Sequence, residues 1–503
     1  MKKKVLDLFK ILAFLAVLCV CILGAIVLVR RNDSSYKYKP FFEQAKKGNI
    51  DILFMGSSHV INGLDPVMLY RDYGYTSYNM GGHGSVMQAT YWELIEALDY
   101  CTPKWVVVDA YMLEKNYRYL DVMEENATDS DKNVAIEQLH LNMDAWPLNK
   151  LKIAAVKDLI QDKEIQKQFL FDFMVYHSRW NELTEDDYKA VFGKENVTSR
   201  FGSEMRKEVE LTPALFPDPQ PGQELSEHTV GAEYLMKIID ECQRRGIGVL
   251  VTYLPFCATT EDKIAANTAG TIAGMYGAPY LNMLNMGIID IYTDLNDPGH
   301  LNITGAAKVT DFIGRWLSEN GDLVDHRDGG MDHGDGVSGS YDEAVEAARL
   351  EDVEFILNPT DLYAELEMLS LDDVSSVVYL NQGSGSFADD EVKRLVSSIS
   401  GTDKIYQVAG PYICIKDVGS GAVYEAGDGE MIDGAPTGLG TLVYQPVEQL
   451  FRFLYAKEDE SFNYMYDDEH IYDDVRIIVY DKDSGEVLAR KYYITYGGRY
   501  KED

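Results

Sequence analysis

The chain has 503 residues and a formal net charge of −36, from 46 Lys plus Arg against 82 Asp plus Glu. Hydrophobic residues make up 46% and charged residues 25%, which is typical of globular proteins and excludes a wholly disordered chain. At roughly 150 residues per domain, the length predicts about two to four domains. The excess of carboxylates argues against a nucleic-acid binder, because phosphate contacts need clustered cations.

Residues 1–31 predict a cytoplasmic tip followed by a membrane anchor. Lysines at positions 2–4 precede an uncharged apolar run over residues 11–29. As a helix this run is about 28 Å long, close to the hydrocarbon thickness of a bilayer. It ends at Arg30 and Arg31 without the small-residue cleavage site of a secretory signal peptide, so we expect an uncleaved signal anchor. The lysines favour a cytoplasmic N-terminus, which makes this a single-pass cell-membrane protein with the rest of the chain extracellular.

Residues 32–324 predict an α/β domain that begins with a polar stalk over 32–50. Apolar runs alternate with helical periodicity, the pattern of a parallel sheet with helices on both faces. We expect buried strands at residues 51–55, 105–108 and 246–252. We expect helices at residues 87–100, 232–245 and 303–319. Residues 115–230 break this rhythm and are expected to form a helix-rich insertion over the strand ends.

A Gly/Asp-rich linker is expected at residues 325–341. His326 and His333 lie among its aspartates, but solvated linkers of this composition are common, so a metal site is the less favoured interpretation. Residues 342–503 contain short apolar or alternating runs at 377–380, 412–415 and 475–480. The last run is followed by a hairpin turn at 481–485. These runs predict a second, smaller α+β domain.

Three short motifs in the first domain carry candidate chemistry. They are GSSH at residues 56–59, NMGGHGS at 79–85 and DPGHLN at 297–302. Ligands bind at the carboxyl ends of strands in open α/β sheets, where a serine on a glycine turn is placed for attack. A glycine-rich turn can direct a backbone N–H at an oxyanion, and a histidine oriented by an aspartate can accept the serine proton. Phosphate binding is the alternative interpretation of the second motif. It is disfavoured because the motif lacks the Lys-Ser/Thr of a phosphate-binding loop.

In this order, the motifs resemble those of the SGNH (GDSL-like) hydrolase superfamily over about residues 45–320. The most specific stretch is HLNITGAAK at 300–308. The resemblance implies a flavodoxin-like fold with Ser58 as nucleophile, His300 as base and Asp297 as the orienting carboxylate. It assigns the oxyanion donors to the N–H groups of Ser58 and Gly84. The chain departs from the family at residues 109–113, DAYML, where the third motif would supply an asparagine as a further donor.

The anchor and the Gly-Ser-Ser motif narrow the resemblance to the cell-envelope branch, which includes teichoic-acid D-alanylation and polysaccharide O-acetylation proteins. This implies an O-acyltransferase or esterase that modifies envelope glycan beside a multi-spanning membrane O-acyltransferase, with no metal or cofactor. Two alternatives stay open: a glycan deacetylase, and a catalytically weak glycan-binding or scaffold partner of that acyltransferase.

Further expectations concern the surroundings of the triad. Nε2 of His300 should lie within about 4 Å of Oγ of Ser58. His59 and His83 are expected to line the cleft or bind substrate. Related envelope proteins also carry a segment like YHSRWNEL at 176–183, in which we expect Arg179 to bind an anionic group. The alternative is that Trp180 packs in a core and Arg179 only caps. The second domain faintly resembles the interleukin-like EMT-inducer fold through DVRIIVYD at 474–481, which implies an accessory carbohydrate-binding or stem module; a spacer is the alternative.

Overall fold

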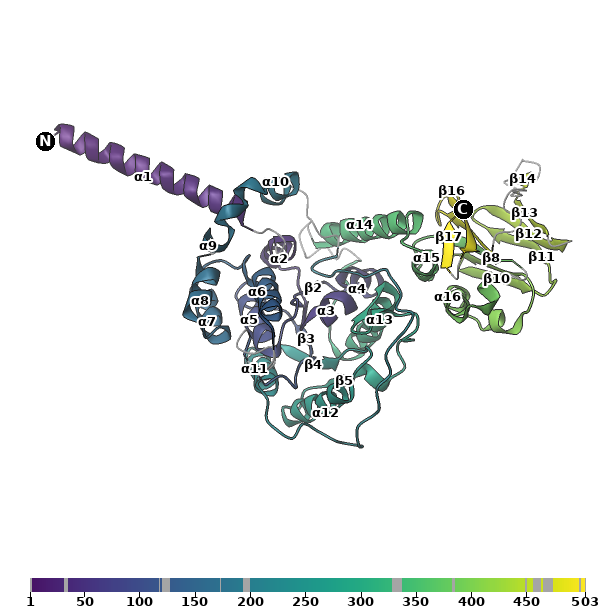
Figure 1. Ribbon diagram of the computed structural model, residues 1–503, viewed down its shortest axis with the longest axis horizontal. Coiled ribbons are helices and arrows are strands. Elements are labelled where there is room, and N and C mark those ends of the chain that lie inside the picture. The colour runs from purple at the N-terminus through teal and green to yellow at the C-terminus, as the bar shows by residue number, and fades with distance from the viewer. Residues whose placement is uncertain are drawn as a thin grey trace.

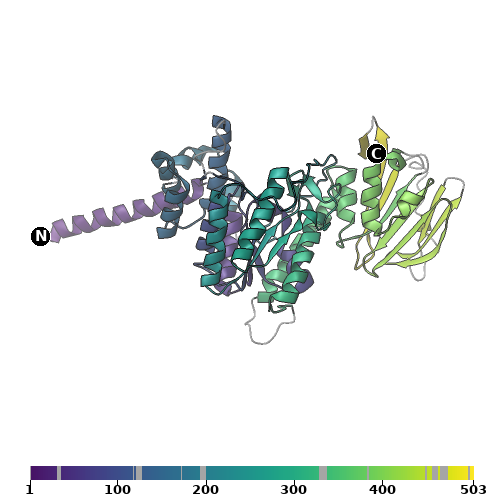
Figure 2. The same ribbon diagram turned by 90° about the horizontal axis from the view of Figure 1, so that it is seen from below.

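The protein has three parts along its longest axis (Figure 1). The computed structural model describes residues 2–30, 35–116, 118–119, 127–171, 173–192, 200–327, 337–381, 385–447, 450–455, 463–464, 474–496 and 499–502. Helix α1 (Lys2–Val29) projects from one end, an α/β domain lies in the centre, and a β-rich domain lies at the other end (Figure 2). Within α1, Asp7–Val29 is long and apolar enough to cross a membrane, and the run expected at 11–29 lies inside it.

A five-stranded parallel sheet forms the centre of the first domain. Its strands are β1 (Ile52–Met55), β2 (Ser77–Asn79), β3 (Trp105–Asp109), β4 (Gly248–Tyr253) and β5 (Tyr280–Asn282). They lie in the order β2-β1-β3-β4-β5, and every neighbouring pair is parallel. Successive side chains enter different cores, with Leu53 and Val106 in one and Phe54 and Val107 in the other. Both faces are therefore apolar and need helical cover.

Helices cover both faces of this sheet (Figure 1). One group is α2 (Ser35–Lys47), α5 (Met87–Ala97), α11 (Val230–Arg244) and α12 (Thr260–Met275). The other is α3 (Ser58–Gly63), α4 (Pro66–Tyr73) and α13 (Ile303–Asn320). The expectation of a stalk at 32–50 was wrong for α2, because Tyr38 and Phe41 bury their rings in the core and fix this helix to the domain.

The helical insertion expected at 115–230 leaves the sheet after β3 and returns at α11. Its elements are α6 (Asp129–Met143), α7 (Lys150–Leu159), α8 (Lys163–Leu170), α9 (Phe173–Tyr176), the 3-10 helix η1 (His177–Asn181) and α10 (Glu185–Phe192). Figure 1 shows the insertion on the α1 side of the domain, with α9 and α10 at the root of α1.

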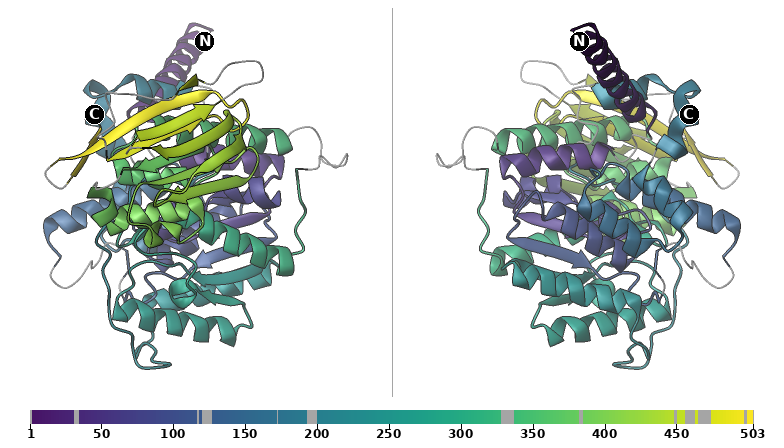
Figure 3. Two further views of the ribbon diagram at one scale, coloured as in Figure 1. Left: turned by 90° about the vertical axis from the view of Figure 1, so that its right-hand side faces the viewer. Right: turned by 90° about the vertical axis from the view of Figure 1, so that its left-hand side faces the viewer.

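The second domain is built on a six-stranded antiparallel sheet that lies across the end of the molecule (Figure 3). Its strands, in spatial order, are β10 (Ala422–Gly427), β9 (Tyr412–Asp417), β8 (Ser375–Leu380), β15 (Val475–Tyr480), β16 (Val487–Tyr496) and β17 (Arg499–Glu502). One face packs on α15 (Leu362–Leu369) and α16 (Asp390–Ser400). A smaller sheet packs on the other face: β11 (Ile432–Thr437), β12 (Gly440–Val447), β13 (Leu450–Tyr455) and β14 (Asn463–Tyr464).

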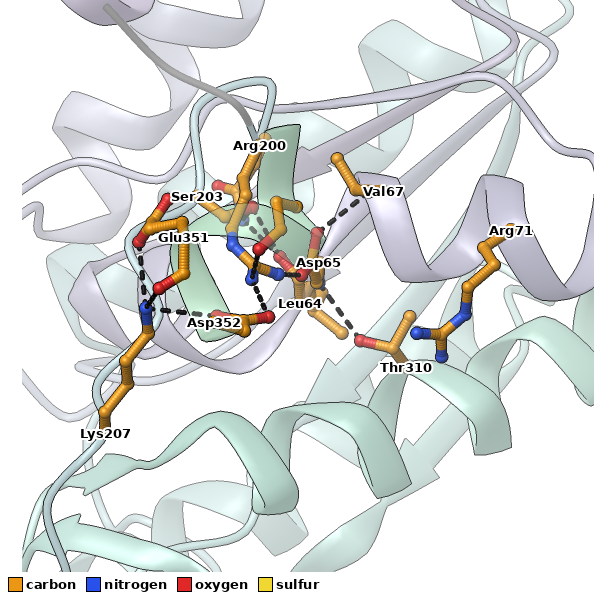
Figure 4. Close-up of polar contacts among 12 residues, drawn as sticks. Leu64, Asp65, Val67, Arg71, Arg200, Ser203, Lys207, Thr310, Glu351 and Asp352 are labelled. Carbon is orange, nitrogen blue, oxygen red and sulfur yellow. Dashed lines mark hydrogen bonds and ion pairs between the residues drawn. The ribbon is translucent and has the colours of Figure 1, made fainter. Parts of the chain in front are cut away.

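Helix α14 (Val337–Leu357) joins the two domains and packs on the first. Tyr341 is fully buried there, and its hydroxyl donates to the Ser77 carbonyl at 2.7 Å. Further along α14, Asp352 accepts from the buried guanidinium of Arg200, which also donates to Asp65 (Figure 4). This buried network holds α14 against the first domain. Residues 337–341 of the expected linker at 325–341 therefore belong to a helix that is fixed to that domain.

Candidate active site

Ser58 lies on a tight turn at the carboxyl end of β1. The turn begins at Gly56, whose φ of 151° favours glycine, and a Cβ there would lie 2.6 Å from Cγ2 of Val60. Ser57 follows as the N-cap of α3, with its Oγ accepting from the His59 N–H at 3.3 Å. Ser58 is the first residue of α3, so its own N–H has no acceptor within the helix. Ser57 therefore caps the helix, and Ser58 lines the cavity.

His300 and Asp297 reach Ser58 from a hairpin that precedes the last helix of the domain. Asp297 ends β6 (Leu295–Asp297) and pairs with His300 at the start of β7 (His300–Leu301). Nε2 of His300 lies 2.9 Å from Oγ of Ser58, within the expected distance. Nδ1 of His300 lies 2.9 Å from Oδ1 of Asp297 and 3.0 Å from Oδ2. Residues 242 positions apart thus form one serine–histidine–carboxylate chain.

The surroundings of Asp297 keep this carboxylate ionised. Burial opposes the charge, but the Gly299 N–H, which donates to Oδ1 at 2.8 Å, and the adjacent His300 lower the pKa of Asp297. The hairpin is held in turn by Asn302, which caps α13 and donates to the Thr293 carbonyl at 2.7 Å. An ionised, fixed carboxylate stabilises a proton on Nδ1 and leaves Nε2 facing Ser58.

A cavity of about 270 Å³ opens above Ser58. The residues that line it are Ser58, His59, Gly84, Val86, Tyr111, Met112, Tyr119, Ala135, Gln138, Gly299 and His300. The lining combines apolar and aromatic side chains with the polar side chains of Ser58, Gln138 and two histidines. Such a mixture suits a small ligand with one polar reacting centre. Met112 adopts a φ of 65°, a conformation that is uncommon for a non-glycine residue and clusters at functional sites.

His59 lines the cavity but is a poor candidate for the base. Its ring stacks on Tyr111 with 3.7 Å between centroids and lies 5.5 Å from the ring of His300. Burial, together with repulsion from His300, lowers the pKa of His59 to about 3. His59 therefore stays neutral at ordinary pH and does not compete electrostatically with a protonated His300.

The glycine-rich turn after β2 is fixed against the Ser58 turn. The Gly82 N–H donates to the Gly56 carbonyl at 2.8 Å, which joins the two turns directly. From the insertion, Asn142 accepts from the His83 N–H at 2.9 Å and donates to the His83 carbonyl at 2.8 Å. From α2, the buried ammonium of Lys37 donates to the Gly81 carbonyl. Three separate segments thus hold the loop that presents Gly84 to the cavity.

Gln138 of α6 lies directly over Gly84. A Cβ on Gly84, whose φ is 58°, would fall 2.2 Å from Oε1 of Gln138, which shows how closely the amide approaches the glycine. Within the described part of the chain, the Gln138 side chain makes no hydrogen bond. The amide group is thus available to a ligand in the cavity.

Behind the Ser58 turn, Asp109 ends β3 as a buried carboxyl. Burial raises its pKa to about 7, although the Leu254 N–H donates to its Oδ1 at 2.8 Å. The Cβ of Asp109 also lies 3.2 Å from the position of a Cβ on Gly56, so this side chain packs against the back of the nucleophile turn. Asp109 does not line the cavity and is a structural neighbour of the site.

Two of the residues expected to bind substrate lie away from the cavity lining. Nε2 of His83 lies 3.3 Å from Oε1 of Glu204, and only its backbone belongs to the loop beside the cavity. Arg179 donates to the carbonyls of Val29 and Arg30 at 3.0 Å each, as the capping alternative expects, but Trp180 is 70% exposed, so the packing expected for it is wrong. The structure therefore does not bring Arg179 to Ser58.

Within the described ranges, no group of three or more His, Cys, Asp or Glu side chains could hold a metal ion. Nε2 of His326 lies 3.0 Å from Oδ2 of Asp51, so this histidine belongs to an ion pair at the start of the sheet. His333 lies outside the described residues.

Sequence reasoning missed Tyr111, Gln138 and Asn142. Tyr111 follows β3 by two residues, and its place beyond a strand end was a usable signal. Gln138 and Asn142 are four residues apart and so share one face of α6. The sequence does not indicate which face of an insertion helix meets the sheet. The places of Gln138 and Asn142 beside the cavity could therefore be recognised only from the structure.

No family model matches the chain, and no curated protein or solved structure matches it either.

Proposed function

We propose that the chain is a membrane-anchored serine O-acyltransferase or esterase of SGNH type that modifies cell-envelope polysaccharide outside the cell. The observation that carries the proposal is the hydrogen-bonded chain from Ser58 through His300 to Asp297 at a cavity. The strand order β2-β1-β3-β4-β5 supports it, because it is the order of flavodoxin-like sheets, with the site at their carboxyl ends.

The chemistry proceeds through a covalent acyl-enzyme. Oγ of Ser58 attacks the acyl carbonyl carbon while its proton passes to Nε2 of His300. The tetrahedral intermediate collapses when His300 returns this proton to the leaving oxygen of the donor. A hydroxyl of the glycan then attacks the acyl carbon, gives its proton to His300, and releases Ser58 when the proton moves back to Oγ. Asp297 holds the imidazole in position and stabilises its positive charge in both halves.

The oxyanion donors in this proposal are the N–H groups of Ser58 and Gly84, with the side-chain amide of Gln138 as the third. Both backbone groups border the cavity, and Gln138 lies over Gly84. The insertion would thus supply the donor that the segment after β3 lacks. Each such donor is worth about 10²–10³ in rate when it is aimed at the developing charge.

The N-terminal helix and the second domain support an envelope role. A helix able to span a membrane lies at one end and the β-rich domain at the other, with the cavity-bearing domain between them (Figure 2). Anchoring confines the enzyme to the surface where a multi-spanning O-acyltransferase delivers acyl groups, and so raises the effective concentration of donor. The second domain would then contact the polymer as an accessory glycan-binding module.

The first experiment is labelling of the full-length protein with a fluorophosphonate probe, followed by peptide mapping. The probe should modify Ser58 in the wild type and give no adduct in Ser58→Ala. Ser57→Ala is the matched control, because it removes the neighbouring hydroxyl and only a helix cap worth about 1 kcal/mol, so labelling should persist. A folded wild type that does not react at Ser58 would leave only a non-catalytic, glycan-binding role.

A second experiment separates transfer from hydrolysis. The full-length protein is given an acyl ester donor with and without unacylated envelope glycan, and acyl glycan and free acid are both quantified. A transferase forms acyl glycan faster than free acid and depends on Ser58. A deacetylase instead releases acid from acetylated glycan and does not respond to an acceptor.

A further inference from the structure

The insertion surrounds the point where α1 leaves the body of the protein. Helices α9 and α10, with η1 between them, contact the last turns of α1 (Figures 1 and 2). Nη1 of Arg179 donates to the carbonyls of Val29 and Arg30 at the C-terminal end of α1. Nη2 of Arg179 donates to Asp187 of α10 at 3.0 Å, so one side chain joins α1, η1 and α10. The segment from α9 to α10 is therefore fixed at the end of α1.

This segment exposes an unusual number of large apolar side chains. We call them the juxtamembrane collar: Phe171, Phe173, Met174, Trp180, Tyr188 and Phe192, which are between 43% and 73% exposed. Soluble surfaces rarely gather so many large apolar groups in one short segment. The largest other run of exposed apolar residues in the described chain belongs to α1 itself. The two sets of exposed side chains lie on contacting elements, because α9, η1 and α10 all contact α1.

The composition of the collar fits the boundary between lipid headgroups and acyl chains. Trp, Tyr and Phe with charged neighbours such as Glu185 and Lys189 are typical of that boundary, whereas the hydrocarbon interior excludes charge. The apolar span of α1 ends at Val29, next to Arg179, so a bilayer crossed by α1 has its surface at the height of the collar. The proximity of a membrane surface thus follows from the contacts of Arg179.

We propose that the collar inserts into the interfacial layer of the bilayer that α1 crosses, with phospholipid as its partner. The inference rests on the membrane anchoring in the proposed function. Collar and helix together give the protein two attachments to one surface, which fix the tilt of the catalytic domain relative to the membrane. An anchor alone would supply one attachment and would not fix that tilt.

Depth-dependent quenching of Trp180 tests this inference. The full-length protein is reconstituted into vesicles of phosphatidylcholine and phosphatidylglycerol that carry a nitroxide either near the headgroup or near the chain end. Emission of Trp180→Phe is subtracted from that of the wild type to isolate Trp180. We expect the shallow label to quench this difference signal at least about twofold more than the deep label. The matched control is Trp316→Phe, which removes a partly buried tryptophan of α13 and should leave lipid-dependent quenching unchanged.

The outcomes separate the collar from the anchor. A protein that sediments with the vesicles while Trp180 stays unquenched overturns the collar and leaves the anchor intact. A protein that alkaline carbonate releases from the vesicles overturns the anchor and the collar with it. A third outcome is that Trp180 is shielded from quencher only in native membranes, where it crosslinks to another protein. That outcome assigns the collar to a contact with a membrane protein and also overturns the inference.

Discussion

At the scale of single residues, neighbouring side chains of the same type in the site have different roles. Ser57 caps a helix while Ser58 faces the cavity, and His59 stays neutral beside a histidine that accepts protons. Identical residue types at adjacent positions thus carry different roles because the turn at Gly56 and the start of α3 orient them differently. Two side chains outside the triad give measurable predictions.

Gln138→Ala should lower kcat for ester cleavage about 10²-fold with little change in KM, because the amide acts only on charge that develops in the transition state. Gln138→Glu should be at least as impaired, since it replaces the donor with an oxygen acceptor of the same shape. Asn133→Ala, at an exposed position of the same helix, is the control. If Gln138→Ala lowers the melting temperature and the activity falls only because less of the protein is folded, the side chain has a packing role instead.

Asp109→Asn should stabilise the protein in a pH-dependent way. The folded-state pKa of Asp109 is raised to about 7 by burial, so the unfolded chain loses this proton first as pH rises. Wild-type stability therefore falls between about pH 4 and pH 7 and the difference then stays constant, up to about 4 kcal/mol. Thermal unfolding of both proteins across this window measures the effect. An offset that is the same at every pH would contradict a buried, titrating carboxyl.

At the scale of elements, the insertion fixes the glycine-rich loop beside the cavity. Asn142 makes two hydrogen bonds with the backbone of His83 and a third, at 3.2 Å, with Oγ of Ser85. The position of Gly84 beside the cavity thus depends on a helix from another part of the chain.

Asn142→Ala should therefore slow labelling of Ser58 by the fluorophosphonate probe and destabilise the protein by about 1–3 kcal/mol, the cost of leaving buried backbone groups unpaired. The reaction rate and the melting temperature are both measured, with Asn133→Ala again as control. Unchanged labelling in a destabilised Asn142→Ala protein would show that the loop holds its shape without the insertion.

The elements also show how far the sequence could predict the structure. Strands β1, β3 and β4 lie within two residues of the expected ranges, because continuous apolar runs leave few alternatives. The hairpin between β15 and β16 also forms at the expected turn. The burial of α2 was missed, since its polar composition hides the few aromatic residues that face the core. The triad motifs could be proposed from their order, but the residues of α6 could not, because an insertion's docking face has no local signal.

At the scale of the whole molecule, a buried ion network fixes α14, the helix that leads into the second domain, to the first domain. Asp352 of α14 contacts Arg200, and its Oδ1 lies 3.0 Å from Nζ of Lys207 (Figure 4). Asp65 completes the network from the N-cap of α4, so the charges come from three distant segments.

Asp352→Asn should destabilise the protein by about 3–5 kcal/mol, because it leaves the buried guanidinium of Arg200 with a single carboxylate. Glu233→Gln removes one partner of the exposed pair with Lys237 and should cost at most about 1 kcal/mol. Thermal unfolding measures both variants. A loss for Asp352→Asn no larger than that of Glu233→Gln would show that the junction does not depend on the buried charges.

The burial of Tyr341 has a consequence for the order in which the chain folds. Tyr341, Ala344 and Ala348 belong to the core of the first domain, although they follow its last helix. During synthesis this core stays incomplete until α14 has left the ribosome, which at about 5–20 residues per second delays its closure by a few seconds after α13. A protein shortened at the Gly/Asp-rich segment before α14 would keep the whole triad yet leave a tyrosine-sized void beside β2. The natural boundary for dividing the two domains therefore lies after Leu357, between α14 and α15.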